Sequence, residues 1–428
     1  MTNTYIRNAI WAPTGTPCDI RIGPGLSSTF HDLSGLTTCD AEILPAGQLS
    51  VPKGATCSDA TGKIVMPALF DMHAKVEVPG RSKRESVSRT GQAAVQGGVW
   101  GMLVMPTRGF MFDNYATLDS FNDAVTQRSA AEMIPAGTIS LHTEGKQQSP
   151  YNTLAARGVS ILTDADHVPE NLLMLHRAMK YAAELGLTFA IRGDVPLLSA
   201  NTYMHPSTTS YALGLHGTPA CAEEIGIEIL LRLARDAGAK LHIQTVSTAQ
   251  GVESIRRAKA EGQQVTAEVA LHHLLYTHES VGDYDTTYKV FPPLREQADC
   301  NALLAGLKDG TIDCIVSAHT PCTPFDKKQD FISAPQGMTA LDTFLPALYT
   351  HLVKPGKLSW AELVQTCCVA PLRIANPKDA ESEETAGVPL LLFDPEAQHT
   401  VTPDTLVCGT LNNPQLGHTL FGHVTLPL

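Results

Sequence analysis

The chain has 428 residues, of which 43% are apolar and 17% charged, and its formal net charge is −12. This composition is typical of a soluble globular protein with one large domain and a smaller one. No apolar window approaches the length of a membrane span and no Lys/Arg block is present, which argues against a membrane anchor and against nucleic acid as a partner. The N-terminus lacks the pattern of a signal peptide, so we expect a cytoplasmic protein.

The two ends of the chain share one style. Residues 1–63 are rich in Gly, Pro and Thr with short alternating apolar runs, and residues 388–428 return to this pattern. Chain termini tend to lie close together. We therefore predict that both segments form one small β-sandwich, and that residues 64–387 form a second domain.

The central segment alternates short apolar runs with longer amphipathic stretches. Eight such β/α units in series favour a closed (β/α)8 barrel over an open parallel sheet. Helices are predicted over 170–186, 221–238 and 248–262, the last beginning at a Ser/Thr cap. The predicted strands cover 63–73, 98–106, 133–142, 158–164, 188–194, 240–247, 265–273 and 311–319.

The ten cysteines are scattered and form no CxxC pair. The adjacent Cys367 and Cys368 stand in an apolar helical pattern. Reduced, mostly buried thiols are therefore expected.

Active sites of such barrels are built at the carboxyl ends of the strands. The first strand ends in Asp71, His73, Lys75 and Glu77, which looks like half of a metal site. The other strand ends carry Thr107, His142, Asp164, Ala165, Asp166, Arg192, Asp194, Thr245, Glu268, His272, His273, Ala318, His319 and Cys322.

A hydrolytic metal centre needs several imidazoles and carboxylates that converge on one cation. Lys75 and Arg192 would instead repel a divalent metal. We therefore interpret His73 as a pocket-lining or hydrogen-bonded histidine. A soft-metal site of His73, His319 and Cys322, or a nucleophile pair of His319 and Cys322, stays open as an alternative.

The adjacent His272 and His273 are interpreted as a buried structural pair, since neighbouring side chains usually point apart.

Several long segments carry a family resemblance. They include "ATGKIVMPALFDMH", "AAVQGGVWGMLVMP", "YKVFPPLR", "LKDGTIDCIVSAHTP" and the stretch that begins "LHIQTVSTAQGVESIRRAKAEG". The chain resembles the bacterial type I dihydroorotases, cyclic amidohydrolases of pyrimidine synthesis, over nearly its whole length. The resemblance implies a (β/α)8 barrel with a β-sandwich formed by the two termini.

The resemblance also implies a two-metal site, and this chain departs from it. In the family motif D-x-H-x-H-x-R, Asp71 and His73 are kept, Lys75 replaces a metal histidine, and Glu77 replaces the arginine that grips the substrate carboxylate. Thr107 stands at the position of a substrate-binding asparagine.

The remaining family positions have changed as well. Ala165, next to the retained Asp164, replaces a bridging aspartate, and Arg192 and Thr245 replace metal histidines. At the other positions Phe291 replaces an asparagine, Ala318 the catalytic aspartate and Cys322 a final histidine, while His242 and His319 are kept. His73 is the clear surviving ligand position, so no intact catalytic set and no metal is expected.

Three hypotheses follow. The first is a catalytically silent homologue, which the resemblance links to aspartate carbamoyltransferase as its partner in a homo- or hetero-oligomer. The second is an active amidohydrolase with a rebuilt zinc or metal-free pocket that uses His73, Asp164, His319 and Cys322. The third is a sensor of small anions.

One structural prediction accompanies the first hypothesis. Lys75 and Arg192 should fill the space of the metals and pair with Asp71, Glu77 or Asp164.

Overall fold

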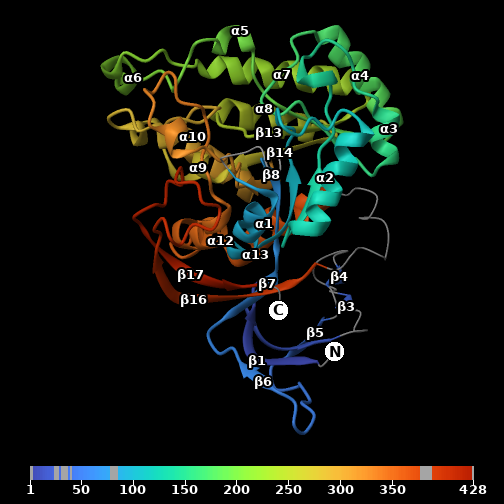
Figure 1. Ribbon diagram of the computed structural model, residues 1–428, viewed down its shortest axis with the longest axis vertical. Coiled ribbons are helices and arrows are strands. Elements are labelled where there is room, and N and C mark those ends of the chain that lie inside the picture. Colours follow the sequence, from blue (N-terminus) through green and yellow to red (C-terminus); the bar gives the residue numbers. More distant parts are fainter. Residues whose placement is uncertain are drawn as a thin grey trace.

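The computed structural model describes residues 3–23, 28–29, 37–38, 41–77, 85–375 and 388–426. Strands from both ends of the chain share one mixed sheet of seven strands in the order β17-β16-β7-β1-β2-β5, with β6 paired to β1 (Figure 1). Its strands are β1 Thr4–Trp11, β2 Thr16–Ile22, β5 Ala41–Pro45, β6 Cys57–Asp59, β7 Ile64–Pro67, β16 Leu390–Thr400 and β17 Thr419–Thr425. The short strands β3 (Ser28–Thr29) and β4 (Thr37–Thr38) pair separately.

The predicted first barrel strand over 63–73 is wrong in one respect, because it is two strands. The first half, β7, pairs in parallel with β1 and antiparallel with β16, so it belongs to the terminal sheet. The chain leaves that sheet at Ala68, whose N–H donates to the carbonyl of Pro389 at 2.9 Å. The boundary at residue 63 therefore moves to Pro67, and the parallel β1–β7 and β1–β6 pairs make the sheet mixed.

The other strands form a three-stranded and a five-stranded sheet, and every pair within them is parallel. Single parallel bridges connect the two sheets at Gly137–Leu162 and at Ala74–His319. The strands follow the predicted chain order, although the third stops at Pro135 rather than near residue 142. They are β8 Leu69–Ala74, β9 Val99–Val104, β10 Glu132–Pro135, β11 Ile161–Leu162, β12 Thr188–Arg192, β13 Lys240–Gln244, β14 Val265–Ala270 and β15 Cys314–Val316.

Helices follow these strands and pack around them (Figure 1). The three helices predicted from the sequence are confirmed as α4, α7 and α8, and the Thr248 side chain caps α8 by accepting from the N–H of Gly251. The α-helices are α1 Val87–Gln96, α2 Tyr115–Arg128, α3 Tyr151–Ala156, α4 Leu172–Glu184, α5 Pro196–Ser199, α6 Thr208–Leu213, α7 Ala220–Ala237, α8 Ala249–Ala260, α9 Leu271–Leu275, α10 Gln297–Lys308, α11 Pro324–Lys327, α12 Phe344–Leu348, α13 Trp360–Val364 and α14 Ala370–Ala375.

Short turns of other helix types complete the elements. These turns are η1 Leu141–Thr143, η2 His278–Val281, η3 Thr286–Tyr288, η4 Leu341–Thr343, η5 Tyr349–Val353 and η6 Gln365–Val369.

Within the described ranges, no helix is long and apolar enough to cross a lipid bilayer.

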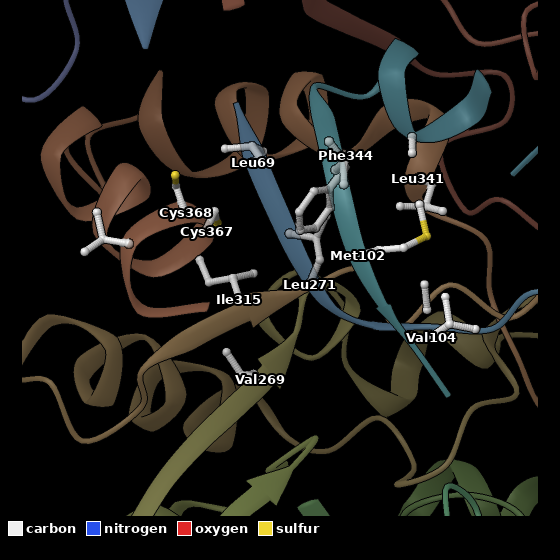
Figure 2. Close-up of a cluster of buried hydrophobic side chains, with 14 of the residues drawn as sticks. Leu69, Met102, Val104, Val269, Leu271, Ile315, Leu341, Phe344, Cys367 and Cys368 are labelled. Atoms are coloured by element: carbon white, nitrogen blue, oxygen red, sulfur yellow. The ribbon is translucent and has the colours of Figure 1, made fainter. Parts of the chain in front are cut away.

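The apolar core lies between the strands and the C-terminal helices. Figure 2 shows Leu69 and Met102 from neighbouring strands beside Phe344, with Cys367 and Cys368 on the adjoining helical turn. All five side chains are fully buried, and each large one contributes roughly 1.5–3 kcal/mol.

The described cysteines are free thiols, and all but Cys57 and Cys221 are buried, which confirms the expectation of mostly buried reduced thiols. Cys39 lies outside the described residues.

Candidate functional site

A cavity of about 890 Å³ opens at the carboxyl ends of the parallel strands. Its size falls within the range of small-molecule sites. It is lined by Lys75, Glu77, Pro106, Thr107, Arg108, Gly109, Asp166, Thr320, Pro321, Thr323, Pro324, Phe325, Asp326, Pro335 and Gln336.

Two cations meet one carboxylate beside this cavity, whose lining includes Lys75 and Asp166. The Nζ of Lys75 donates to Oδ2 of Asp166 at 2.5 Å, and Nη1 of Arg192 lies 3.8 Å from Oδ1. The side chains of Lys75 and Arg192 are 15% and 10% exposed, whereas that of Asp166 is 69% exposed. Enclosure among protein atoms opposes ionisation of Asp166, but the charges of Lys75 and Arg192 outweigh it and hold its pKa well below the usual range.

The predicted partners of these cations were wrong. Asp166 is the common partner of Lys75 and Arg192. The described contacts of Asp71 and Asp164 are with other groups, and Glu77 lines the cavity wall. The sequence places Asp166 two residues beyond Asp164, and only the turn of the chain after β11 decides which carboxylate reaches the cations.

Asp71 and Asp164 instead join neighbouring strand ends. Asp71 accepts hydrogen bonds from the N–H of Ser317 at 3.0 Å, from its hydroxyl, and from the N–H of His73 at 3.2 Å. Asp164 accepts from the N–H of Ser140 at 2.9 Å and from its hydroxyl at 2.5 Å. Burial raises the pKa of both carboxyls to about 6, against the effect of these hydrogen bonds. Their role is to hold the strand ends together.

His73 belongs to a buried hydrogen-bonded chain. Its Nδ1 lies 2.6 Å from Oε1 of Glu268, whose Oε2 lies 3.1 Å from Nε2 of His242. Nδ1 of His242 in turn lies 2.8 Å from the hydroxyl of Thr266. Burial opposes ionisation of Glu268, but its contacts with His73 and His242 lower its pKa to about 2. Because an ionised carboxylate only accepts, both imidazoles donate to it.

This series of hydrogen bonds confirms the interpretation of His73 as a hydrogen-bonded histidine. No role was predicted for Glu268, although the sequence carries one signal for it. A carboxylate inside the buried strand β14 must have a partner, because an isolated buried charge is very costly.

The alternative site of His73, His319 and Cys322 is not assembled. Nε2 of His319 lies 2.8 Å from Oε2 of Glu85, and its Nδ1 accepts from the N–H of Ala340 at 3.3 Å. Both ring nitrogens are therefore occupied. Across the part of the chain that the structure describes, no group of three His, Cys, Asp or Glu side chains could hold a metal ion.

His272 and His273 are buried, as predicted for a structural pair, but the stated geometric reason was wrong. Their ring centroids lie 4.5 Å apart, so the rings lie side by side. Burial lowers the pKa of His273 to about 4, although its hydrogen bond to the carbonyl of Pro292 opposes the shift. Burial also holds the pKa of His272 well below its usual value, so both rings are neutral near pH 7.

Three further predicted site positions share an unusual backbone. Ala165, Thr245 and Ala318 have φ angles of 52°, 46° and 47°, in the left-handed region that costs a non-glycine residue roughly 1–2 kcal/mol. Thr245 directly follows β13, whereas Ala318 and Ala165 stand two and three residues beyond the ends of β15 and β11. The chain thus forms left-handed turns at all three positions, while two of the three carry only a methyl group.

Thr107 and Phe291 complete the predicted set. The Thr107 hydroxyl accepts from the N–H of Phe110 at 3.2 Å at the cavity wall. The Phe291 ring lies 4.5 Å below the guanidinium carbon of Arg192, a cation–π contact. The aromatic ring and the cation stabilise each other where the resemblance implies an asparagine and a metal histidine.

A two-metal centre does not fit this set of residues. Lys75 and Arg192 offer N–H donors and positive charge, whereas a metal ligand must offer a lone pair. Their contacts with Asp166 place an ion-paired cluster, rather than metal ligands, beyond the ends of β8 and β12. His73 is itself hydrogen-bonded through Nδ1 to Glu268, so a single imidazole nitrogen remains at the site.

Comparison with solved structures defines the class of protein first. The chain superposes over its whole length on L-hydantoinase (dihydropyrimidinase) from Arthrobacter aurescens, with a TM-score of 0.82, 20% identity and 95% of that chain covered. Dihydropyrimidinase from Brevibacillus agri gives a TM-score of 0.77 at 19% identity, covering 100% of this chain and 94% of the other. The protein therefore has the α/β fold of the amidohydrolases.

Sequence comparison then gives the family. The dihydro-orotase-like family matches residues 62–251. The chain is 36% identical to dihydroorotase from Pelotomaculum thermopropionicum, with 90% of each chain covered. It is 34% identical to dihydroorotase from Mycobacterium leprae, with 89% of each covered. The chain belongs to the dihydroorotase-like family.

Proposed function

We propose that this dihydroorotase-like protein does not hydrolyse dihydroorotate and instead supports aspartate carbamoyltransferase in pyrimidine biosynthesis. The observation that carries the proposal is the Lys75–Asp166–Arg192 cluster at the ligand positions of the family. A hydrolytic metal lowers the pKa of bound water from about 16 to about 7. Neither cation can do this, and Ala318 offers no group that accepts the proton of water.

The charge balance supports the same proposal. Relative to the pattern that the resemblance implies, the site gains the cations Lys75 and Arg192 and loses the carboxylates at Ala165 and Ala318. At the metal positions these exchanges add four positive charges, the charge of two dications, while the exchange of arginine for Glu77 adds two negative charges at the cavity wall. We infer that the protein keeps the electrostatic balance of a metal-loaded site without a metal, and that the two interstrand bridges close its sheets into a (β/α)8 barrel.

Substrate recognition has changed as well. Glu77 lines the cavity at the position where the resemblance implies a carboxylate-binding arginine. An anionic substrate would meet a negative charge there. Thr107 replaces the neighbouring asparagine and is bonded to its own loop.

Two measurements test this proposal. Elemental analysis of the purified protein should find no stoichiometric zinc, and a dihydroorotate hydrolysis assay should find no turnover. Stoichiometric zinc together with turnover would overturn the proposal. The partnership is tested by sedimentation of micromolar mixtures with aspartate carbamoyltransferase, where two independently sedimenting proteins would refute it.

A second candidate is an amidohydrolase that works without metal. It is favoured by the names of the relatives and by the orientation of His73, whose Nε2 has no hydrogen-bond partner among the described residues. Glu268 holds Nδ1, so Nε2 could take a proton from water as it attacks an amide carbon, and return that proton to the leaving nitrogen. Lys75 would stabilise the oxyanion.

This candidate makes a different prediction. Any hydrolysis of cyclic amides should survive a metal chelator and fall about 10²–10⁴-fold in His73→Gln. Absence of turnover by the unmodified protein rules it out.

A further inference from the structure

Arg192 has hydrogen-bonding capacity that its neighbours do not use. Its Nη2 donates to the carbonyl of Asp166 at 2.9 Å, and Nη1 lies 3.5 Å from the carbonyl of Phe291. Its buried Nε has no hydrogen-bond partner among the described residues, and the same holds for the buried hydroxyl of Thr245. A guanidinium with five N–H donors and a fork geometry is suited to a carboxylate that accepts two bonds at once.

The Arg192 guanidinium and the Thr245 hydroxyl belong to the same part of the site. Arg192 ends β12 and pairs with Gln244, the residue before Thr245. Both side chains are about nine-tenths buried or more. Leaving such buried donors unsatisfied destabilises the protein, so a ligand that accepts hydrogen bonds from them is stabilised at this place.

The charge at this place favours an anion. Lys75 and Arg192 carry two positive charges, and among the described residues Asp166 is the carboxylate that ion-pairs with both. That carboxylate is largely exposed to the cavity and lies too far from Arg192, at 3.8 Å, for a direct hydrogen bond. The carboxylate of Asp166 therefore competes with any incoming anion for the positive charges of Lys75 and Arg192.

We propose that the former metal position binds the carboxylate group of a small molecule, with Arg192, Lys75 and Thr245 as donors and Asp166 as an internal competitor. The site differs from the one at Glu77 and Thr107, where the resemblance places the carboxylate of the family's substrate. The inference rests on the proposed function, since a metal-loaded site would leave no room for it. Through this site, the assembly with aspartate carbamoyltransferase would respond to the concentration of a small carboxylate.

The rest of the cavity limits the class of ligand. Glu77 and Asp326 also line the walls, and Arg108 is the other cation there. A molecule with one carboxylate, directed inward, and neutral or cationic groups elsewhere suits this lining. Acetate and glycine are the simplest probes of that class, and inorganic phosphate is the contrasting oxyanion.

Titration calorimetry on the full chain tests the proposal with two variants that should change the affinity in opposite directions. Asp166→Asn removes the competitor and should raise the affinity for acetate and glycine about tenfold, whereas Arg192→Gln should lower it at least about tenfold. Thr245→Val keeps the shape of the side chain and should lower it about threefold. Asp309→Asn, at the exposed pair with Arg256, is the matched control and should change nothing.

Several outcomes would overturn the inference. These are an unchanged or weaker affinity in Asp166→Asn, an affinity of Thr245→Val and Arg192→Gln equal to the unmodified chain, and binding of phosphate alone. The lack of saturation by about 50 mM probe in both the unmodified chain and Asp166→Asn would do the same. Zinc content and hydrolysis of the same preparations are measured separately, so turnover would sink the proposed function while the titrations still report on the anion site.

Discussion

The site has two layers that differ in what they retain. The supporting layer, made by Asp71 with Ser317 and by His73 with Glu268, is hydrogen-bonded between strands. The layer next to the cavity, here called the facing layer, carries Lys75 and Arg192 where the resemblance implies metal ligands. A buried polar group that loses its partner destabilises the fold, whereas a cavity-facing group can change at little cost. The residues that match the family motif therefore remain where the stability of the fold depends on their hydrogen bonds.

The largest effect is expected when the metal ligands that the resemblance implies are introduced into the facing layer alone. The variant Lys75→His, Ala165→Asp, Arg192→His, Thr245→His and Ala318→Asp should bind stoichiometric zinc, because the supporting hydrogen bonds and the left-handed turns are in place. Structural zinc sites reach about 10 kcal/mol or more of binding free energy, so the gain is large. Elemental analysis and a competition titration with a chelator measure it.

The control for this restoration removes the support. Glu268→Gln added to the same five changes should weaken zinc binding about 10–100-fold, because His73 loses its orienting carboxylate. Equal affinity with and without Glu268 would show that the supporting layer has no such function.

Removing the centre of the supporting layer should have the next largest effect. Glu268→Ala leaves His73 and His242 without their shared acceptor and should lower the free energy of unfolding by about 3 kcal/mol. Denaturant unfolding followed by circular dichroism measures it. The exposed Glu279→Ala should stay within about 0.5 kcal/mol, and a similar loss in both variants would contradict the distinction.

The supporting layer should also show a pH dependence. The pKa of Asp71 is raised from 3.8 to about 6 in the folded protein, so the unfolded chain releases this proton first as pH rises. Asp71 therefore contributes stability below pH 4 that is lost as pH rises through about 6. The difference in unfolding free energy between the unmodified protein and Asp71→Asn should fall over this interval, and a constant difference would exclude the shift.

The smallest effect concerns the facing layer. Phe291→Leu removes the ring under Arg192 and should lower the free energy of unfolding by about 1 kcal/mol through the lost cation–π contact and reduced burial. Phe325→Leu, at a ring that is 77% exposed, is the matched control and should change it by less than about 0.5 kcal/mol. Equal losses would show that the contact with Arg192 is energetically neutral.

Much of the element order could be predicted, because periodicity reports local structure. The amino-acid sequence alone shows the amphipathic patterns of α4, α7 and α8. It also shows the apolar runs of the parallel strands. The split between β7 and β8 is not visible, since Ile64–Ala74 is one nearly continuous buried run. Whether such a run crosses from one sheet to another depends on its neighbours, here β1 and β16.

By itself, the sequence determined which side chains stand at the strand ends and that cations occupy positions where the resemblance implies metal ligands. Only the tertiary structure decided the pairing. Asp166 rather than Asp71 or Asp164 meets Lys75 and Arg192, and Glu268 holds His73. The physical reason is that ionic partners are selected by distances of a few ångströms between side chains from different strands, and spacing along the chain does not encode those distances.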